Sequence, residues 1–379
     1  MTEAADGPTA LVEAVDRRDL PRFEAAWRDL AARAGEPNAF AEPDFLIPAL
    51  QRLANARVRT LLVWRDADRG ALIGLAAIAP PRMPFGLASL WRSEQAALPA
   101  ILLDRDAAVE AFAAIIDSLR ARAPSLAGLR LPFSTVDGPV AAAAAALAAR
   151  RALSLKAAHR RRRAALVVGA KAGFEARLDK RRRKEWARQR RRLEELGPLE
   201  SRVGADASAI EGFLAVENSG WKGARRSALD AHAERAAFAR ETLARFAARG
   251  ALEIQTLAVK DELIAAAAVL RAGNRAFYWK TAYDERFAAY SPGVQATLDL
   301  SRRLERDPGL SLVDSCAIAD HPMIDRTWRD HIELIDLALS LTPGGGVAFA
   351  LATIVAHGVE RLKRRARRLA DSTTRLARA

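Results

Sequence analysis

Apolar and polar residues follow one order of elements twice along the chain. In the first half, alternating apolar runs predict strands over residues 58–64, 71–79 and 87–91, a helix over 106–122 and a strand over 127–132. In the second half, they predict strands over 252–259, 263–271 and 275–282, a helix from about Pro292 and a strand over 310–314. Strand, strand, strand, helix, strand thus occurs twice, about 190 residues apart, without obvious residue identity between the copies.

The remaining segments are mostly helical in their spacing. We predict helices over residues 7–34, 139–152, 173–196, 206–218 and 230–249. A short strand is expected over 165–168, and 332–341 is either a strand or a helix. After three glycines that end at Gly346, the tail has a small apolar patch and then a basic amphipathic helix from Val359 to Leu376. We divide the chain into a first half (1–155), a second half (156–342) and a basic tail (343–379).

Composition narrows the class of protein. The chain has 379 residues and half are apolar, which excludes global disorder. One cysteine, Cys316, excludes a disulfide framework and a cysteine-built zinc site, and the five histidines show no metal-ligand spacing, so we expect no metal. Met1 to Leu20 lacks the apolar core of a signal peptide, and the apolar run Val347 to Ala356 is too short to span a bilayer. We therefore expect a cytoplasmic protein.

The net charge of +14 is concentrated in two short segments. Residues 156–196 carry a net +11 and residues 357–379 a net +6, which leaves −3 for the rest. The basic helix within 173–196 could bind nucleic acid, or it could simply be a solvated face, because few aromatic residues interleave with it. The tail helix could contact an anionic membrane surface at the inner face of the membrane, provided that the apolar patch 347–356 is exposed.

One segment in the second half suits an anion. A strand that ends in Trp279-Lys280-Thr281-Ala282-Tyr283-Asp284 is followed, after a short loop, by the helix start Tyr290-Ser291-Pro292-Gly293-Val294. A helix N-terminus has unpaired N–H groups and partial positive charge, and Gly293 would let the backbone approach a phosphate. The alternative is an ordinary helix with Ser291 as its N-cap.

Three motifs resemble the GNAT-type acyltransferases of the cellulose-biosynthesis CelD/BcsL-like family. They are Gly220-Trp221-Lys222-Gly223, the segment from Trp279 through Gly293, and Asp314-Ser315-Cys316 with Asp320-His321-Pro322-Met323-Ile324-Asp325. This family is similar in turn to the FemABX peptidyltransferases, which pair two GNAT-like halves and use aminoacyl-tRNA. The resemblance implies two tandem GNAT-like halves with mixed, mostly antiparallel sheets flanked by helices.

The same resemblance implies an acetyl-CoA or other acyl-CoA site in the second half. Pantetheine would lie between the strands 275–282 and 310–314, and the diphosphate would lie on the loop before the next helix. The cofactor-binding residues would then be Lys280, Thr281, Ala282, Tyr290, Ser291, Pro292, Gly293 and Val294. The loop departs from the usual GNAT pattern, which has more glycine and a preceding basic residue.

Acyl transfer needs a proton acceptor for the nucleophile, a donor to the carbonyl oxyanion and a proton for the leaving thiolate. We consider Asp284, Asp314 and His321 as bases, and Tyr283 or Tyr290 as the acid. The backbone N–H groups of residues 278–282 are candidates for the oxyanion donor. Each side chain also has a structural alternative, as a turn cap, a loop histidine or part of an aromatic cluster.

Two lysines stand out because the chain uses arginine almost everywhere, with only eight lysines among 60 basic residues. Lys222 follows Trp221 and Lys280 follows Trp279, and we assign substrate contacts to Trp221, Lys222 and Trp279. Cys316 is expected to be a small buried residue rather than a nucleophile.

The leading hypothesis is an acyltransferase that acts on an amine or hydroxyl of an envelope polysaccharide-related or small-molecule acceptor. The alternatives are a FemABX-like enzyme that uses charged tRNA and a non-catalytic module that tethers a membrane or nucleic acid.

Overall fold

The computed structural model describes residues 10–81, 83–219 and 228–359. Thirteen described strands form one mixed sheet, in the order β1-β2-β3-β4-β6-β13-β7-β12-β11-β10-β9-β8, with β5 paired to β3. The strands are β1 (Leu11–Val15), β2 (Arg59–Trp64), β3 (Leu72–Ala79), β4 (Leu87–Leu90), β5 (Ile101–Leu103), β6 (Gly128–Thr135), β7 (Leu153–Val167), β8 (Leu199–Gly204), β9 (Leu252–Val259), β10 (Glu262–Ala272), β11 (Arg275–Tyr283), β12 (Leu312–Asp314) and β13 (Asp330–Pro343).

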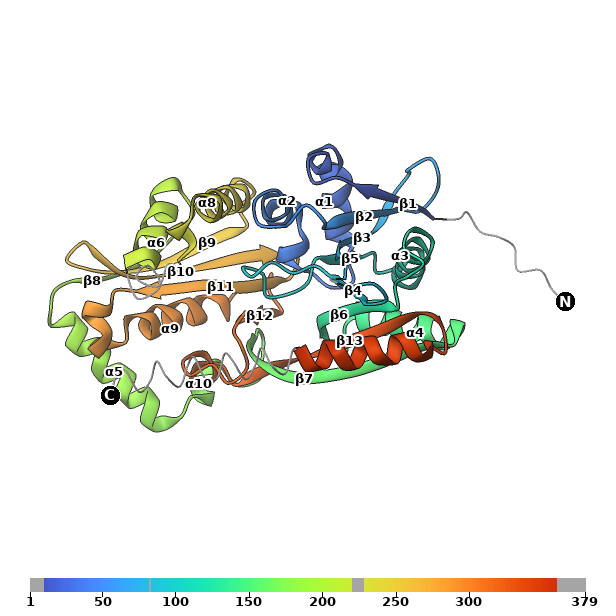
Figure 1. Cartoon of the computed structure of the whole chain (residues 1–379). Helices are drawn as coiled ribbons and strands as arrows, with labels where there is room; N and C mark the ends of the chain where they lie inside the picture. The colour runs from blue at the N-terminus through green and yellow to red at the C-terminus, as the bar shows by residue number, and fades with distance from the viewer. Residues whose placement is uncertain (1–9, 82, 220–227, 360–379) are drawn as a thin grey trace.

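Helices flank this sheet on both faces (Figure 1). They are α1 (Glu24–Arg33), α2 (Pro43–Arg52), α3 (Ala108–Arg122), α4 (Pro139–Arg151), α5 (Lys180–Glu194), α6 (Ala207–Ser219), α8 (Ala233–Ala248), α9 (Pro292–Leu304) and α10 (Ile324–Thr327). Short 3-10 helices include η3 (Phe174–Arg177) and η5 (Glu285–Tyr290). Residues 346–359 form a further helix, called here the C-terminal helix. No helix among the described residues is both long enough and apolar enough to cross a membrane.

The two halves share one strand arrangement and exchange strands. In the first half the order is β1-β2-β3-β4-β6, with β4 and β6 parallel, and in the second half it is β8-β9-β10-β11-β12, with β11 and β12 parallel. The long strands β7 and β13 are antiparallel partners that run through both halves, so that β13 pairs with β6 while β7 pairs with β12. The α/β fold of two GNAT-like halves is therefore built into a single continuous sheet.

Strand β10 shows why these residues form a central strand. Its sequence is almost entirely apolar, which is typical of a strand covered on both faces. Ala266, Ala268 and Leu270 face the core that includes α6 and α8, whereas Ala267 and Val269 face the core beneath α9. Figure 1 shows α6 and α8 on one side of this part of the sheet and α9 on the other.

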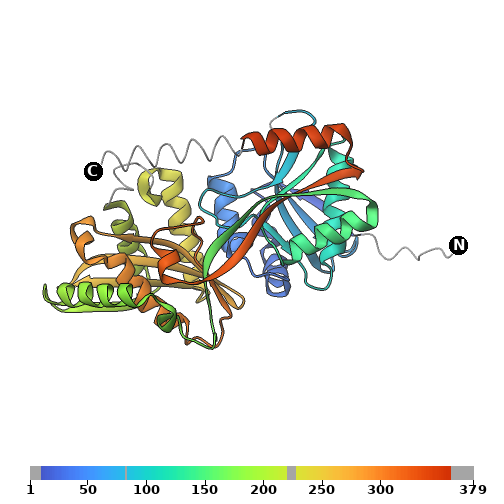
Figure 2. The same cartoon turned by 90° about the horizontal axis from the view of Figure 1, so that it is seen from below.

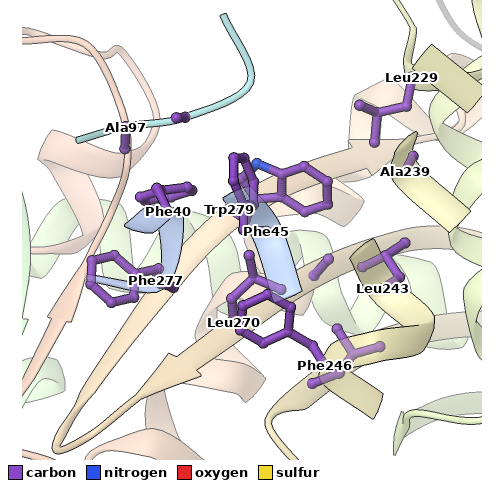
Figure 3. Close-up of a cluster of buried hydrophobic side chains, with 14 of the residues drawn as sticks. Phe40, Phe45, Ala97, Leu229, Ala239, Leu243, Phe246, Leu270, Phe277 and Trp279 are labelled. Atoms are coloured by element: carbon purple, nitrogen blue, oxygen red, sulfur yellow. The ribbon is translucent and has the colours of Figure 1, made fainter. Parts of the chain in front are cut away.

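A shared hydrophobic core joins the halves. Phe40 of the first half packs edge-on against Phe277 of the second, and Phe45 packs edge-on against Trp279 (Figure 3). Phe45 also packs edge-on against Phe238 of the second half. The loop of residues 96–98 belongs to the same cluster. One face of the candidate site is therefore supported by the opposite half.

Several sequence predictions are confirmed and three need correction. The two repeated sets of strands and helices lie close to the predicted positions. The predicted helix over 7–34 is confirmed only in its second part, as α1, whereas Leu11–Val15 is strand β1 and pairs antiparallel with β2. The predicted short strand over 165–168 is part of the long β7, and the predicted helix over 173–196 begins only at Lys180, after η3. Residues 332–341 lie in strand β13. Most of the predicted tail helix, Val359 to Leu376, lies outside the described residues.

Candidate functional site

The candidate site lies where the parallel strands β11 and β12 separate. Arg275, Ala276 and Phe277 pair with β12, and no later residue of β11 pairs with it. The backbone edge of β11 from Tyr278 to Tyr283 that faces away from β10 therefore has no strand beside it among the described residues. Such an edge offers N–H and C=O groups to an extended ligand.

A cavity of 440 Å³ occupies this opening. Its volume lies within the range of small-molecule sites, about 300–1,000 Å³. Most of the lining is apolar, with a few polar groups among it. The lining residues are Val216, Glu217, Tyr278, Trp279, Lys280, Thr281, Ala282, Tyr283, Gly293, Ser315, Cys316, Ala317, His321, Pro322, Met323 and Ile324.

Two sets of contacts with the first half support the cavity. The Trp279 indole N–H donates to the carbonyl of Gln95 at 2.7 Å. Arg163 forms a buried ion pair with Asp314 at 3.1 Å and donates a second bond to the Ala97 carbonyl at 3.1 Å. These bonds fix the strands on both sides of the opening to the loop of residues 95–97.

Tyr283 and the start of α9 form the outer end of the cavity. Tyr283 is 37% exposed, and its ring lies against Gly293, where a Cβ atom would come within 3.3 Å of Tyr283 Cδ1. Ser291 occupies the N-cap position with a positive φ of 53°, but its side chain makes no capping bond. Its carbonyl accepts from the amides of Val294 and Gln295. In this first turn, the backbone N–H of Gly293 therefore has no carbonyl acceptor within the helix.

His321 lines the cavity in the loop before α10. Its Nδ1 accepts from the backbone amides of Met323 and Ile324, both at 3.4 Å. A nitrogen that accepts these bonds is unprotonated, so the neutral ring carries its proton on Nε2. In this tautomer Nε2 is a hydrogen-bond donor, and the role of His321 as a base stays a prediction.

Glu217 was missed by the sequence analysis. Its side chain lines the cavity, is only 2% exposed, and accepts from the Leu229 amide at 2.7 Å. The signal is present in the sequence, because Glu217 continues the helical stripe of Ile210, Phe213 and Leu214, which are buried in the core. Burying a carboxylate in an apolar stripe costs free energy unless hydrogen-bond donors or cations contact it. Buried carboxylates of this kind are common in functional sites.

The structure places other candidates outside the cavity lining. Asp284 caps η5 and pairs with Arg286, whose hydrogen bonds hold the pKa of that carboxyl below its usual range. Asp314 is held in the Arg163 ion pair. The guanidinium carbon of Arg192 lies 5.5 Å from the centre of the Tyr290 ring. Neither carboxylate faces the cavity as a free base.

The cofactor residues predicted from sequence divide in the same way. Lys280, Thr281, Ala282 and Gly293 line the cavity, whereas Ser291, Pro292 and Val294 form the helix start behind it. The ammonium of Lys280 lies 6.0 Å from the Trp279 ring centre. Among the predicted substrate contacts, Trp279 lines the cavity, and Trp221 and Lys222 lie outside the described residues.

Cys316 also lines the cavity and is half-buried rather than fully buried. Desolvation, with the nearby Asp314 carboxylate, raises the pKa of its thiol well above the usual range. The thiol therefore stays protonated at neutral pH and is a poor nucleophile. Among the described residues, no group of three or more His, Cys, Asp or Glu side chains is arranged to hold a metal ion.

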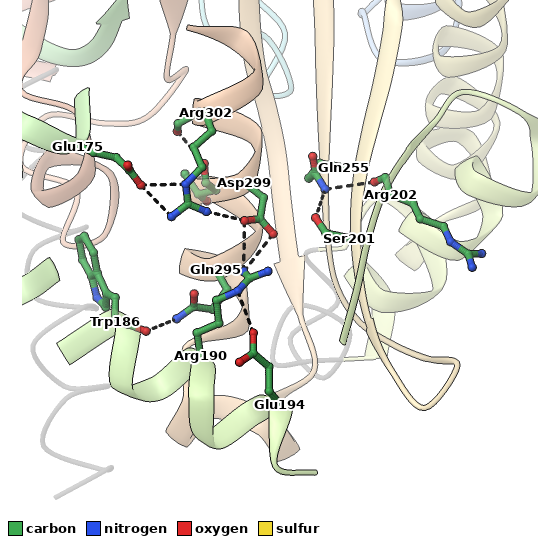
Figure 4. Close-up of polar contacts among 12 residues, drawn as sticks. Glu175, Trp186, Arg190, Glu194, Ser201, Arg202, Gln255, Gln295, Asp299 and Arg302 are labelled. Carbon is green, nitrogen blue, oxygen red and sulfur yellow. Dashed lines mark hydrogen bonds and ion pairs between the residues drawn. The ribbon is translucent and has the colours of Figure 1, made fainter. Parts of the chain in front are cut away.

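The basic helix α5 packs beside α9 and η5. Arg190 pairs with Asp299 at 3.1 Å, and Gln295 donates to the Trp186 carbonyl at 3.0 Å (Figure 4). Gln189 donates to the Ala289 carbonyl at 3.4 Å, so the helix lies against the short segment between β11 and α9.

Comparisons with known proteins agree with this geometry. Residues 180–321 match the family described as "Acetyltransferase (GNAT) domain". The matched segment includes β11, β12 and every residue of the cavity lining except three in the loop and turn after His321. No curated protein matches the sequence. The part of the chain that forms most of the cavity is therefore similar to a GNAT-type acetyltransferase domain.

Solved structures match most of the chain, including both halves. A crystal structure of FemX has 11% identity and a TM-score of 0.52, and the match covers 86% of this chain and 96% of that one. The C-terminal domain of a putative lysylphosphatidylglycerol synthetase from Agrobacterium fabrum has 12% identity and a TM-score of 0.52, covering 89% and 96%. A conserved protein of unknown function from Bacteroides thetaiotaomicron has 11% identity and a TM-score of 0.51, covering 87% and 100%. At such identities the similarity shows the fold alone.

Proposed function

We propose that this protein transfers an acyl group from an acyl-CoA thioester to an amine or hydroxyl acceptor, at the cavity between β11 and β12. The observation that carries the proposal is the separation of this parallel pair beyond Phe277, which leaves six residues of strand edge beside a 440 Å³ cavity. An extended pantetheine arm carries amide groups that such an edge can pair. The acceptor class, an envelope polysaccharide-related or small molecule, is proposed from the motif resemblance.

The cavity fits the acyl arm of this donor better than its diphosphate. The apolar lining and the β11 edge suit the arm. At the start of α9, however, Pro292 has no amide hydrogen and two amides already donate to Ser291. Gly293 is left to offer one N–H, together with the partial positive charge of the helix end.

The lining supplies the groups that the chemistry needs. The nucleophile of the acceptor would lose its proton to the Glu217 carboxylate as it bonds to the acyl carbon. Backbone N–H groups of β11 would stabilise negative charge on the acyl oxygen. As the carbon–sulfur bond breaks, Tyr283 would give its hydroxyl proton to the leaving thiolate. His321, with its proton on Nε2, would add a further donor.

A second candidate function is aminoacyl transfer from charged tRNA, and helix α5 favours it. Arg181, Lys184, Arg188 and Arg191 are exposed, recur at helical spacing, and have no ion pair among the described residues. Such a stripe can neutralise the phosphates of a nucleic acid. The helix lies against the segment that joins β11 to α9, close to the outer end of the cavity. The motif resemblance to FemABX enzymes implies the same donor.

Binding measurements on the full chain separate the two donors. We expect acetyl-CoA or a longer acyl-CoA to raise the melting temperature, because a ligand that binds the native state stabilises it. Release of free thiol should then depend on an amine or hydroxyl acceptor. If tRNA stabilises the protein instead, and Arg181→Glu with Arg188→Glu removes that effect, the second candidate is correct. Stabilisation by neither donor would contradict both.

A further inference from the structure

The C-terminal helix has an apolar face that nothing among the described residues covers. Its outward side chains include Val347 (75% exposed), Leu351 (57%), Ile354 (65%), Val355 (48%) and Val359 (42%). Their positions follow the spacing of a single helical stripe. They are five of the eleven exposed large hydrophobic residues that the described part of the chain contains.

The opposite face fixes the helix to the sheet. Phe349 is 1% exposed and lies against Gly128 of β6, where a Cβ atom would meet its ring at 2.9 Å. The Lys156 ammonium of β7 lies 5.4 Å from the Phe349 ring centre. Figure 2 shows the helix on one side of this part of the sheet and α4 on the other. The apolar stripe is therefore held facing away from the protein.

The composition of the helix is unlike that of a solvated surface helix. Residues 346–359 contain no Asp, Glu, Lys or Arg. Its polar side chains are His357 and Thr353, and Thr353 is buried, with its hydroxyl donating to backbone carbonyls of the same helix. A surface helix in water normally carries charged residues on its outer face.

The basic sequence that follows the C-terminal helix indicates what covers its apolar stripe. Residues 360–379 contain eight Lys or Arg and two Asp or Glu. Anionic lipid headgroups attract such basic segments near the membrane surface. A second copy of the chain would instead bring two like-charged tails together, which disfavours self-association through this face.

We propose that the C-terminal helix is an interfacial membrane anchor, which lies in the plane of an anionic bilayer with its apolar stripe among the headgroups and upper acyl chains. The stripe supplies apolar contact, and the basic segment supplies attraction to negative charge. The proposal does not depend on the acyl donor. It would place the enzyme beside acceptors that are themselves attached to a membrane.

The test is sedimentation of the full chain with lipid vesicles. We expect binding to mixed phosphatidylcholine–phosphatidylglycerol vesicles, weak binding to phosphatidylcholine alone, and loss of binding as salt screens the attraction. Leu351→Glu combined with Ile354→Glu should lower the partition coefficient about tenfold or more, since each places a charge among the lipid chains. Both positions are exposed, so the fold should be retained.

Val203→Glu is the matched control, because Val203 is 44% exposed and lies on β8 at the far end of the sheet. Its binding to vesicles should equal that of the wild type. The proposal is overturned if the wild type binds neither vesicle, or if the double variant binds as well as the control. It is also overturned if the wild type is a dimer that the double variant converts to a monomer.

Discussion

Glu217 is the side chain that we propose as the proton acceptor in the cavity. The carboxylates that sequence reasoning selected are held elsewhere, Asp284 by Arg286 and Asp314 by Arg163. Glu217 is buried against the cavity and has the Leu229 amide as one partner. Its place in an apolar helical stripe is visible in the sequence, but the cavity beside it depends on β11, which begins 58 residues later in the chain.

Glu217→Gln should lower kcat strongly with little change in the melting temperature. The amide keeps an oxygen for the Leu229 N–H but cannot accept the proton of the nucleophile. General-base catalysis contributes about 10²–10⁴-fold, so we expect a loss of about 100-fold or more. Steady-state release of free thiol measures it.

Glu211→Gln is the control for this variant. Glu211 lies on the same helix, outside the cavity lining, and pairs with Arg240. It should retain wild-type kcat. Equal rates in the two variants would show that Glu217 has no role in proton transfer.

Glu42 should give the stability of the protein a pH dependence. Burial raises the pKa of Glu42 to about 7 from an ordinary 4.5, although Arg249 contacts it. The folded state therefore binds this proton more tightly than the unfolded state. The resulting stabilisation is complete below about pH 4.5 and is lost as the pH rises through 7.

The Glu42→Gln variant lacks this titration. The melting temperature of the wild type relative to the variant should therefore fall between pH 5 and pH 8. Thermal unfolding of both proteins across this range measures the difference. A difference that rises with pH would mean that the Arg249 ion pair outweighs the cost of burial.

At the scale of elements, the hydrophobic periodicity of the sequence predicts helices and strands that have a buried apolar face. It misses strands that form only because they pair with a distant strand. The three-strand meanders and α3, α4 and α9 were predicted because each has a clear apolar face. Strand β1 was predicted as helix, because five residues that pair with β2 carry no strong alternation of their own. Strand β7 was recognised only at its apolar end, because its basic middle, Arg160 to Arg163, does not resemble a buried strand.

The Arg163–Asp314 pair joins two of these elements and is expected to be structural. Breaking one partner of a buried ion pair costs about 3–5 kcal/mol, whereas replacing both by apolar residues costs far less. Asp314→Asn should therefore destabilise the protein by about 3 kcal/mol. Arg163→Met combined with Asp314→Leu should recover most of the loss.

Chemical denaturation of the single and double variants measures these differences. If Asp314→Asn instead abolishes activity while the free energy of unfolding is unchanged, Asp314 is the catalytic base that the sequence suggested. Recovery of stability without recovery of activity in the double variant would indicate that the pair also positions β12.

At the scale of the whole molecule, the strand exchange makes the site a product of both halves. Strands β7 and β13 cross between the halves, and the loop of residues 95–97 supports Trp279 and Arg163. The doubled strand order predicted two similar halves, but no local pattern predicts which strands exchange. The basic segments of the sequence correspond to α5, the middle of β7 and the tail.

The central claim is that the opening between β11 and β12 holds the acyl donor, and calorimetric titration of acetyl-CoA tests it most directly. Ala317 lines the cavity and is half-buried, whereas the adjacent Ile318 is 73% exposed and does not line it. Ala317→Trp fills the opening, and Ile318→Trp adds the same side chain outside it. We predict that the wild type and Ile318→Trp bind acetyl-CoA with similar Kd, and that Ala317→Trp binds at least about tenfold more weakly, a loss of about 1.4 kcal/mol. Equal binding by all three folded proteins, or no binding of any acyl-CoA by the wild type, would contradict the account.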